Sequence, residues 1–136
     1  MSDIRPELSK KNKYWIPRHR YYELKHFVMQ LPEWKEKLKE IDSMVRACQD
    51  PAGRINSISD PVGRAVEKRS EYVNNINMCL RVARETGPII GHYILKAIVD
   101  GVSYDVLAVQ NGIPCSKDTY YDLYHKFFWL LDRARK

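Results

Sequence analysis

Apolar residues recur at intervals of three and four along much of the chain, which is the spacing that places side chains on one face of an α-helix. The pattern predicts one helix over residues 18–31 and a second over residues 33–46, with Pro32 breaking the run between them. Residues 47–60 are rich in small and polar side chains and are expected to form a loop. The body of the chain is therefore predicted to be helical throughout, an all-α fold.

A longer helix is predicted over residues 61–85. Asp60 is suited to cap its first turn, and Gly87 with the proline after it stops the helix. Its apolar residues recur alternately at four and three positions, a seam like that of a coiled coil, which only Arg69 interrupts. Such a seam either packs on the two N-terminal helices of the same chain or forms a homodimer. With those helices it is predicted to form a helical bundle over residues 18–86.

The last third of the chain has the layout of a helix-turn-helix. Residues 89–99 are apolar on nearly all sides, which predicts a buried helix. A short helix over residues 104–110 follows and stops at Gly112, which tolerates positive φ. Ser116 is a suitable cap for the next helix. We predict that residues 89–136 form a tri-helical unit of the type that places its last helix in the DNA major groove.

The helix that begins at Ser116 has two different faces. Its apolar stripe consists of Tyr120, Leu123, Phe127 and Leu131, and Phe128, Trp129 and Leu130 widen this face. The side chains off this stripe that are predicted to reach a groove are Lys117, Asp118, Tyr121, Asp122, His125 and Lys126. A helical hairpin that simply packs into a core would show the same spacing. The capped turn and the basic end at Arg133, Arg135 and Lys136 favour DNA binding.

Positive charge is concentrated at the N-terminus. The chain carries a net charge of +6, and residues 1–20 contain six Lys and Arg against two acids. We expect residues 1–17 to form a basic flexible arm, and Arg18 and Arg20 to bind DNA phosphates together with it. A solvated tail that only aids solubility would have the same composition.

The sequence argues against several other classes of protein. No apolar run approaches the ~18 residues of a membrane helix, and the N-terminal MSDIRPELSK does not match a signal peptide. Cys48, Cys79 and Cys115 are widely separated and the histidines are scattered, so no metal site is predicted. The P-loop, GxGxxG, HExxH and GxSxG motifs are absent. We therefore expect a cytoplasmic protein that is not an enzyme and binds no cofactor.

Three segments together resemble a known family. They are ISDPVGRAVEKR at 58–69, IIGHYILKAIVDGVSYDVL at 89–107 and GIPCSKDTYYDLYHKFFWLLD at 112–132. The combination is similar to the small phage-borne transcriptional regulators of Gram-positive bacteria, the RinA-like and ArpU-like late-gene activators. The C-terminal unit of those proteins is similar to the promoter-reading domain of sigma factors. The resemblance extends loosely over residues 17–135 and more closely over residues 89–131.

The resemblance implies roles for the residues around the turn, with Ser116 matching the cap of the recognition helix. The side chains that the family directs at the groove match Lys117, Asp118, Tyr121, Asp122 and Lys126. The positions close enough to touch phosphates match Thr119 and His125. The chain departs from the family in two places. Its turn, which contains Pro114, is longer than in sigma factors, and Asp122 and Tyr124 stand where arginines are expected.

These observations predict a DNA-binding transcriptional regulator, encoded by a phage or prophage, that reads duplex DNA with the helix from Ser116. RNA polymerase and a second copy of the chain, bound through residues 61–85, are further candidate partners. Two alternatives stay open. A small terminase subunit for DNA packaging also joins a helix-turn-helix to an oligomerising helix. A protein-interaction adaptor would use the same helical unit without DNA.

Overall fold

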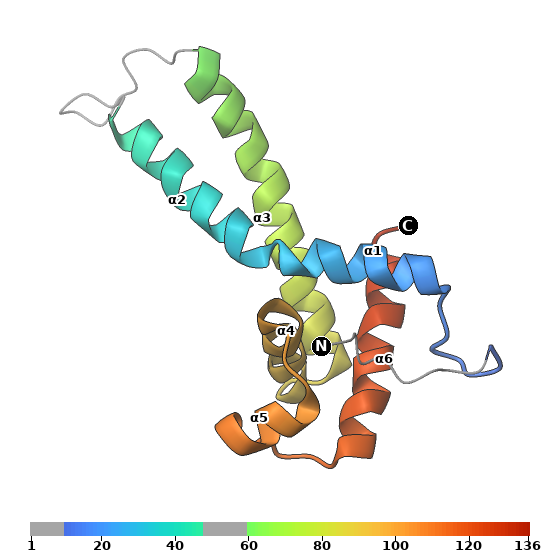
Figure 1. Ribbon diagram of the computed structural model, residues 1–136. Coiled ribbons are helices and arrows are strands. Elements are labelled where there is room, and N and C mark those ends of the chain that lie inside the picture. The colour runs from blue at the N-terminus through green and yellow to red at the C-terminus, as the bar shows by residue number, and fades with distance from the viewer. Residues whose placement is uncertain (1–9, 48–59) are drawn as a thin grey trace. The chain divides into compact units, whose positions relative to one another are not determined.

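Figure 1 shows the computed structural model of the protein, which describes residues 10–47 and 60–136. Within these residues the chain forms six helices and no strand, which confirms the predicted all-α fold. The helices are α1 (Arg18–Met29), α2 (Leu31–Ala47), α3 (Asp60–Thr86), α4 (Ile90–Asp100), α5 (Tyr104–Asn111) and α6 (Lys117–Ala134). The predicted loop over residues 47–60 lies outside the described residues, apart from its two ends, which belong to α2 and α3.

The chain divides into two units, and α3 contributes to both. The hairpin unit lies within Gln30–Asn77 and contains α2 and the first part of α3. The main unit contains the described residues up to Met29 together with Met78–Lys136. The sequence predicts a bundle over residues 18–86 that is separate from residues 89–136. The structure corrects this division, because α1 packs on α4 and α6 and belongs to the main unit.

In the hairpin unit, α2 and the first part of α3 lie side by side and antiparallel (Figure 1). Leu31, Trp34 and Ile41 of α2 are buried, and they recur at helical spacing. Arg69 interrupts the apolar seam of α3 and has a partner on α2, since its Nε donates to Asp42 Oδ1 at 3.0 Å. An exposed ion pair contributes less than about 1 kcal/mol to stability. The pair nevertheless gives the Arg69 charge a partner on α2. The homodimer expected through α3 stays a prediction.

α2 begins earlier than the sequence predicts. It starts at Leu31, so Pro32 lies in its first turn and does not precede it. The N–H groups of a first turn have no carbonyl partner within the helix, and a proline is therefore tolerated there. Gln30 alone separates α2 from α1, and its carbonyl accepts a hydrogen bond from the Trp34 N–H at 3.0 Å.

The main unit buries its core between α1, α4, α5, α6 and the last turns of α3. Its most deeply buried large side chains are Tyr21, Leu24, Val28, Val82, Ile94, Leu107, Tyr120, Phe127, Phe128 and Leu131. Burial of one such side chain contributes roughly 1.5–3 kcal/mol, so this core holds the helix-turn-helix in place. No helix of the described residues combines the length and the apolar character that crossing a bilayer requires.

Gly91 allows α4 to approach α3 closely. A Cβ atom at this position would overlap the carbonyl group of Ala83. Only glycine lets the two backbones come this near, because it has no side chain to place between them. This contact fixes where α4, the first helix of the tri-helical unit, begins.

The sequence predicts a flexible arm through residue 17, but residues 10–17 form a turn that belongs to the main unit. The Trp15 N–H donates to the Asn12 carbonyl at 3.0 Å, and the Tyr14 N–H donates to Asn12 Oδ1 at 2.9 Å. Ile16 is buried, which anchors the segment. The structure thus corrects the predicted arm for these residues, and the rest of the arm lies outside the described part of the chain.

Candidate nucleic-acid interface

The turn between α5 and α6 has the local geometry that the sequence predicts. Gly112 follows α5 in the left-handed conformation, at φ 60°, and Ile113 behind it is buried. Ser116 is the N-cap of α6: its Oγ accepts a hydrogen bond from the Thr119 N–H at 3.2 Å. The same hydroxyl donates to Thr119 Oγ1 at 3.0 Å. A side-chain cap of this kind stabilises a helix by about 1 kcal/mol, so the start of α6 is well defined.

Two further contacts tie the beginning of α5 to the beginning of α6. The Tyr104 hydroxyl donates to the Cys115 carbonyl at 2.6 Å, and the Tyr104 ring lies 5.4 Å from that of Tyr120. Tyr120 is buried, and this burial raises the pKa of its hydroxyl, which stays protonated. Asp105 in the first turn of α5 lies 3.6 Å from Lys117 Nζ. The angle between the two helices is thus held by side chains from both.

Sequence reasoning did not identify Tyr104 and Asp105 as part of this site. Both lie in the first turn of α5, where the apolar spacing gives no sign that they reach across the turn.

Most of the residues predicted to reach a groove are accessible at the start of α6. The exposed ones are Lys117, Asp118, Thr119 and Asp122, and the half-buried ones are Tyr121 and Lys126. Tyr121 is held by ring contacts with Tyr120 and Tyr124, at 5.0 Å and 5.8 Å between centroids. The structure therefore brings six predicted residues onto the first three turns of one helix.

His125 is a correction, because its side chain is only 6% exposed and does not reach a phosphate. The apolar stripe read from the sequence is too narrow. α6 is contacted by α1, α4 and α5, so a wider arc of its surface is covered. Tyr124, also outside the predicted stripe, is buried too, and its hydroxyl shares a hydrogen bond with Tyr21 of α1 at 2.8 Å.

Arg20 is a second correction. Its Nε donates to Asp132 Oδ1 at 2.7 Å, and its Nη1 lies 3.6 Å from Glu23 Oε1. These carboxylates neutralise the charge that the sequence assigns to a DNA phosphate. Arg18 is exposed and lies over the Tyr22 ring, 5.9 Å from its centroid.

The predicted binding residues fall into two groups at opposite ends of α6. Ser116 and Asp132 are separated by sixteen residues, or about 24 Å of helix at 1.5 Å per residue. Arg20 is bound at the Asp132 end, so the two predicted arginines do not join the groove-facing group.

The start of α6 carries little positive charge. Lys117 and Lys126 stand against Asp118 and Asp122 on the same helix and against Asp105 of α5. With two lysines and three aspartates, the surface offers hydrogen-bond donors and acceptors more than electrostatic attraction. Its net charge of −1 provides no electrostatic attraction for DNA phosphates.

The described residues contain no group of three or more His, Cys, Asp or Glu side chains placed to hold a metal ion. Of the two cysteines in the described part, Cys79 is buried and Cys115 is half-buried in the turn. Burial raises the pKa of both thiols, which lowers their reactivity at neutral pH. No protein-family model, curated protein or solved structure matches this chain.

Proposed function

We propose that this protein is a DNA-binding transcriptional regulator that reads duplex DNA with the first three turns of α6. The observation that carries the proposal is the capped turn: α5, a left-handed Gly112, and Ser116 bonded to Thr119 at the start of an 18-residue helix. This is the layout with which helix-turn-helix proteins present the N-terminal residues of a helix to base edges.

The chemistry of the exposed side chains supports a division of roles. Lys117 and Lys126 donate hydrogen bonds to phosphates or to guanine, and Asp118 accepts from a cytosine amino group in the major groove. Tyr121 adds a hydroxyl on a ring that is already held by its neighbours. Lys117 exchanges its contact with Asp105 for DNA at little cost, because both partners are more than half exposed.

The resemblance to RinA-like and ArpU-like regulators supports a phage or prophage origin and action in the cytoplasm of a bacterial host. RNA polymerase and a second copy of the chain, bound through α3, are the partners that such a role implies. These assignments belong to the proposal as a whole and are tested with it.

A triple variant tests the proposal directly. The probe is a duplex DNA fragment selected from random sequences by the unaltered protein. The test variant is Lys117→Ala/Tyr121→Ala/Lys126→Ala. The control is Lys35→Ala/Lys39→Ala, which removes the same charge from exposed positions of α2. We expect the triple variant to lose the selected site and the control to retain it. Removal of Lys126 alone should weaken binding to all sequences and reduce the salt slope by about one. Unchanged binding in a triple variant that still folds would overturn the proposal.

A protein-interaction adaptor is the second candidate. The charges around the start of α6 favour it, because two lysines stand there against two aspartates of α6 and Asp105 of α5. A monomer or dimer without DNA affinity at low salt would identify this function. A ring-shaped oligomer that binds DNA would instead indicate a small terminase subunit. Size-exclusion chromatography with light scattering, run beside the binding assay, separates these outcomes.

A further inference from the structure

Positive charge is concentrated at the end of α6 that lies away from the turn. Residues 10–23 and 129–136, which meet there, contain eight Lys and Arg and two acids. The basic residues are Lys10, Lys11, Lys13, Arg18, Arg20, Arg133, Arg135 and Lys136. The acids, Glu23 and Asp132, both pair with Arg20, at 3.6 Å and 2.7 Å, and Asp132 also lies 3.8 Å from Lys136. The net charge of these two segments is +6, which is a strong attraction for a polyanion.

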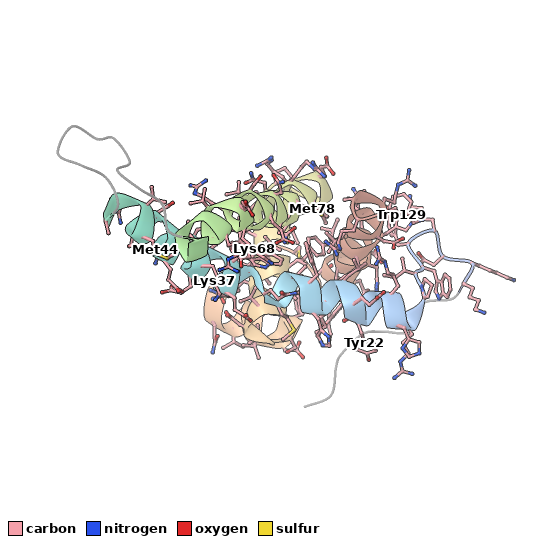
Figure 2. All side chains as sticks on the ribbon, turned by 90° about the horizontal axis from the view of Figure 1, so that it is seen from above. Tyr22, Lys37, Met44, Lys68, Met78 and Trp129 are labelled. Carbon is pink, nitrogen blue, oxygen red and sulfur yellow. The ribbon has the colours of Figure 1, made fainter. Side chains whose placement is uncertain are left out.

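Aromatic side chains lie among these cations. The Tyr14 and Trp129 rings meet edge to face, with centroids 5.6 Å apart. Lys13 Nζ lies 4.9 Å from the Tyr14 ring centroid, and the Arg133 guanidinium lies 4.7 Å from that of Trp129. Both rings are half-buried and both cations are exposed. We call these four residues the cation–aromatic cluster; Figure 2 shows Trp129 on α6 beside the segment that precedes α1.

Packing alone does not account for the composition of the cluster. An edge-to-face aromatic pair is enough to hold residues 10–17 against α6. Each cation over a ring, Lys10 over Trp15 at 5.8 Å included, gains about 0.5–1 kcal/mol of cation–π attraction, but together the cations gather like charges on one surface. Such an arrangement is expected where a bound polyanion neutralises the charge.

The cluster and the groove-facing residues lie at opposite ends of α6. Trp129 follows Ser116 by thirteen residues, or about 20 Å of helix. The major groove is only about 12 Å wide and 8.5 Å deep. A helix whose first turns read base edges therefore holds this end outside the groove.

We propose that the cation–aromatic cluster binds single-stranded nucleic acid. Lys13 and Arg133 contact phosphates, and an unpaired base stacks on Tyr14 or Trp129. Duplex DNA would use the charges but not the rings, because its bases are already stacked on each other. A positively charged surface with aromatic side chains is the combination that single-strand binding uses. The proposal does not depend on the duplex site at the other end of α6.

Binding of a fluorescently labelled thymidine homopolymer to the full chain at low salt tests the proposal. Loss of a stacking contact costs at least about fivefold in affinity, and we expect a loss of this size for Trp129→Leu and for Tyr14→Leu. Neither change removes a charge, so affinity for a mixed-sequence duplex of equal length should stay the same. Lys13→Gln/Arg133→Gln should lower the affinity for the homopolymer more than Lys35→Gln/Lys39→Gln, the charge-matched control on α2.

Ultraviolet cross-linking uses the unaltered chain, so this second test does not require any variant to fold. The homopolymer is irradiated with the protein, and the attached peptides are identified by mass spectrometry. We expect attachment at Tyr14 or Trp129. Attachment confined to other segments would overturn the proposal.

Two other results would also overturn it. If leucine at Tyr14 and Trp129 leaves homopolymer affinity unchanged in folded variants, the surface attracts any polyanion by charge alone. If polyglutamate binds as tightly as the homopolymer, the surface fits an acidic protein. The Lys117/Tyr121/Lys126 variant should keep its affinity for the homopolymer, and the cluster variants should keep their affinity for the selected duplex. The two assays therefore test the two proposed sites separately.

Discussion

The Tyr21 and Tyr124 hydroxyls share a hydrogen bond of 2.8 Å in the core of the main unit. Both side chains are buried, and the Tyr21 ring also meets the edge of Phe128 at 4.8 Å between centroids. The pair joins α1 to the middle of α6. The helix that carries the candidate nucleic-acid interface is therefore supported by an element that begins almost one hundred residues earlier, at Arg18.

The coupling across this pair is measurable. A double-mutant cycle of Tyr21→Phe and Tyr124→Phe keeps the rings and removes only the hydroxyls. We expect each single change to lower the free energy of unfolding by about 1 kcal/mol, and the pair to show a coupling energy of similar size, because a buried hydrogen bond contributes about that much. Urea denaturation of the four proteins gives these values. Strictly additive effects would show that the two hydroxyls act independently.

The aromatic residues near the end of α6 should differ in what they support. Phe127 and Phe128 are buried, whereas Trp129 is half-buried on Tyr14 and Arg133. Truncation of a buried Phe to Ala costs ~3–5 kcal/mol, and a domain of this size has only ~5–15 kcal/mol of stability. Phe127→Ala and Phe128→Ala should each largely unfold the main unit and abolish DNA binding indirectly.

Trp129→Ala provides the matched comparison, and we expect it to lower the melting temperature less than either Phe variant. Thermal melts followed by circular dichroism decide the order. A Phe127→Ala protein as stable as the parent would contradict the burial on which the prediction rests.

The predictions that the structure confirms are those decided by a few neighbouring residues. Ser116 caps α6 because its hydroxyl reaches an N–H three residues ahead, and Gly112 takes positive φ because it has no Cβ. Both effects are local, so one stretch of sequence contains all the information they need. The positions of the helices were predictable for the same reason, and most predicted helix ends lie within one or two residues of the observed ones.

The corrections concern which helices meet. The burial of His125 depends on the helices that pack on α6, and Arg20 of α1 pairs with Asp132, which lies 112 residues further along the sequence. Periodicity shows that α1 has an apolar face, but it does not show which helix covers that face. A long-range hydrogen bond such as Tyr21 to Tyr124 leaves no local pattern in either segment. Site residues assigned from one helix alone therefore include some that another helix buries.

The close approach of α4 to α3 predicts that Gly91 tolerates no side chain. Gly91→Ala would place a Cβ against the Ala83 carbonyl, and backbone cannot move aside without separating the helices. We expect a loss of at least about 2 kcal/mol in the free energy of unfolding, in the range of overpacked cores. Gly87→Ala is the control, because its Cβ would meet only the Ile90 Cβ, at an ordinary 3.9 Å.

Denaturant titrations of the two alanine variants compare them directly. Alanine raises intrinsic helix propensity at Gly91, in the first turn of α4, but not at Gly87, which lies between α3 and α4. This gain opposes the clash, so a lower stability of Gly91→Ala than of Gly87→Ala is due to the clash. Equal stabilities for the two variants would mean that α4 can shift away from α3 at no cost.

The buried thiol of Cys79 should make the protein less stable at alkaline pH. Burial raises its pKa from 9.0 to about 12, with the Arg135 charge opposing part of the shift. Above pH 9.0 the unfolded chain releases this proton while the folded chain keeps it. The unfolded state then binds fewer protons, so the free energy of unfolding falls as pH rises, by up to about 1.4 kcal/mol per pH unit for one group. The loss continues until the folded thiol itself ionises.

Urea denaturation at a series of pH values from about 8 to about 11 measures the slope. Cys79→Ala removes the group, so the variant should start less stable at neutral pH, because of the space it leaves, but lose stability less steeply. Burial also raises the pKa of Tyr120, and this residue adds to the slope of both proteins at the upper end of the range. Cys115→Ala is the matched control: its thiol is half-buried, so its removal should change the slope less. Parallel curves for the parent and Cys79→Ala would show that the Cys79 thiol ionises as readily in the folded chain as in the unfolded one, and that the core around it is open to water.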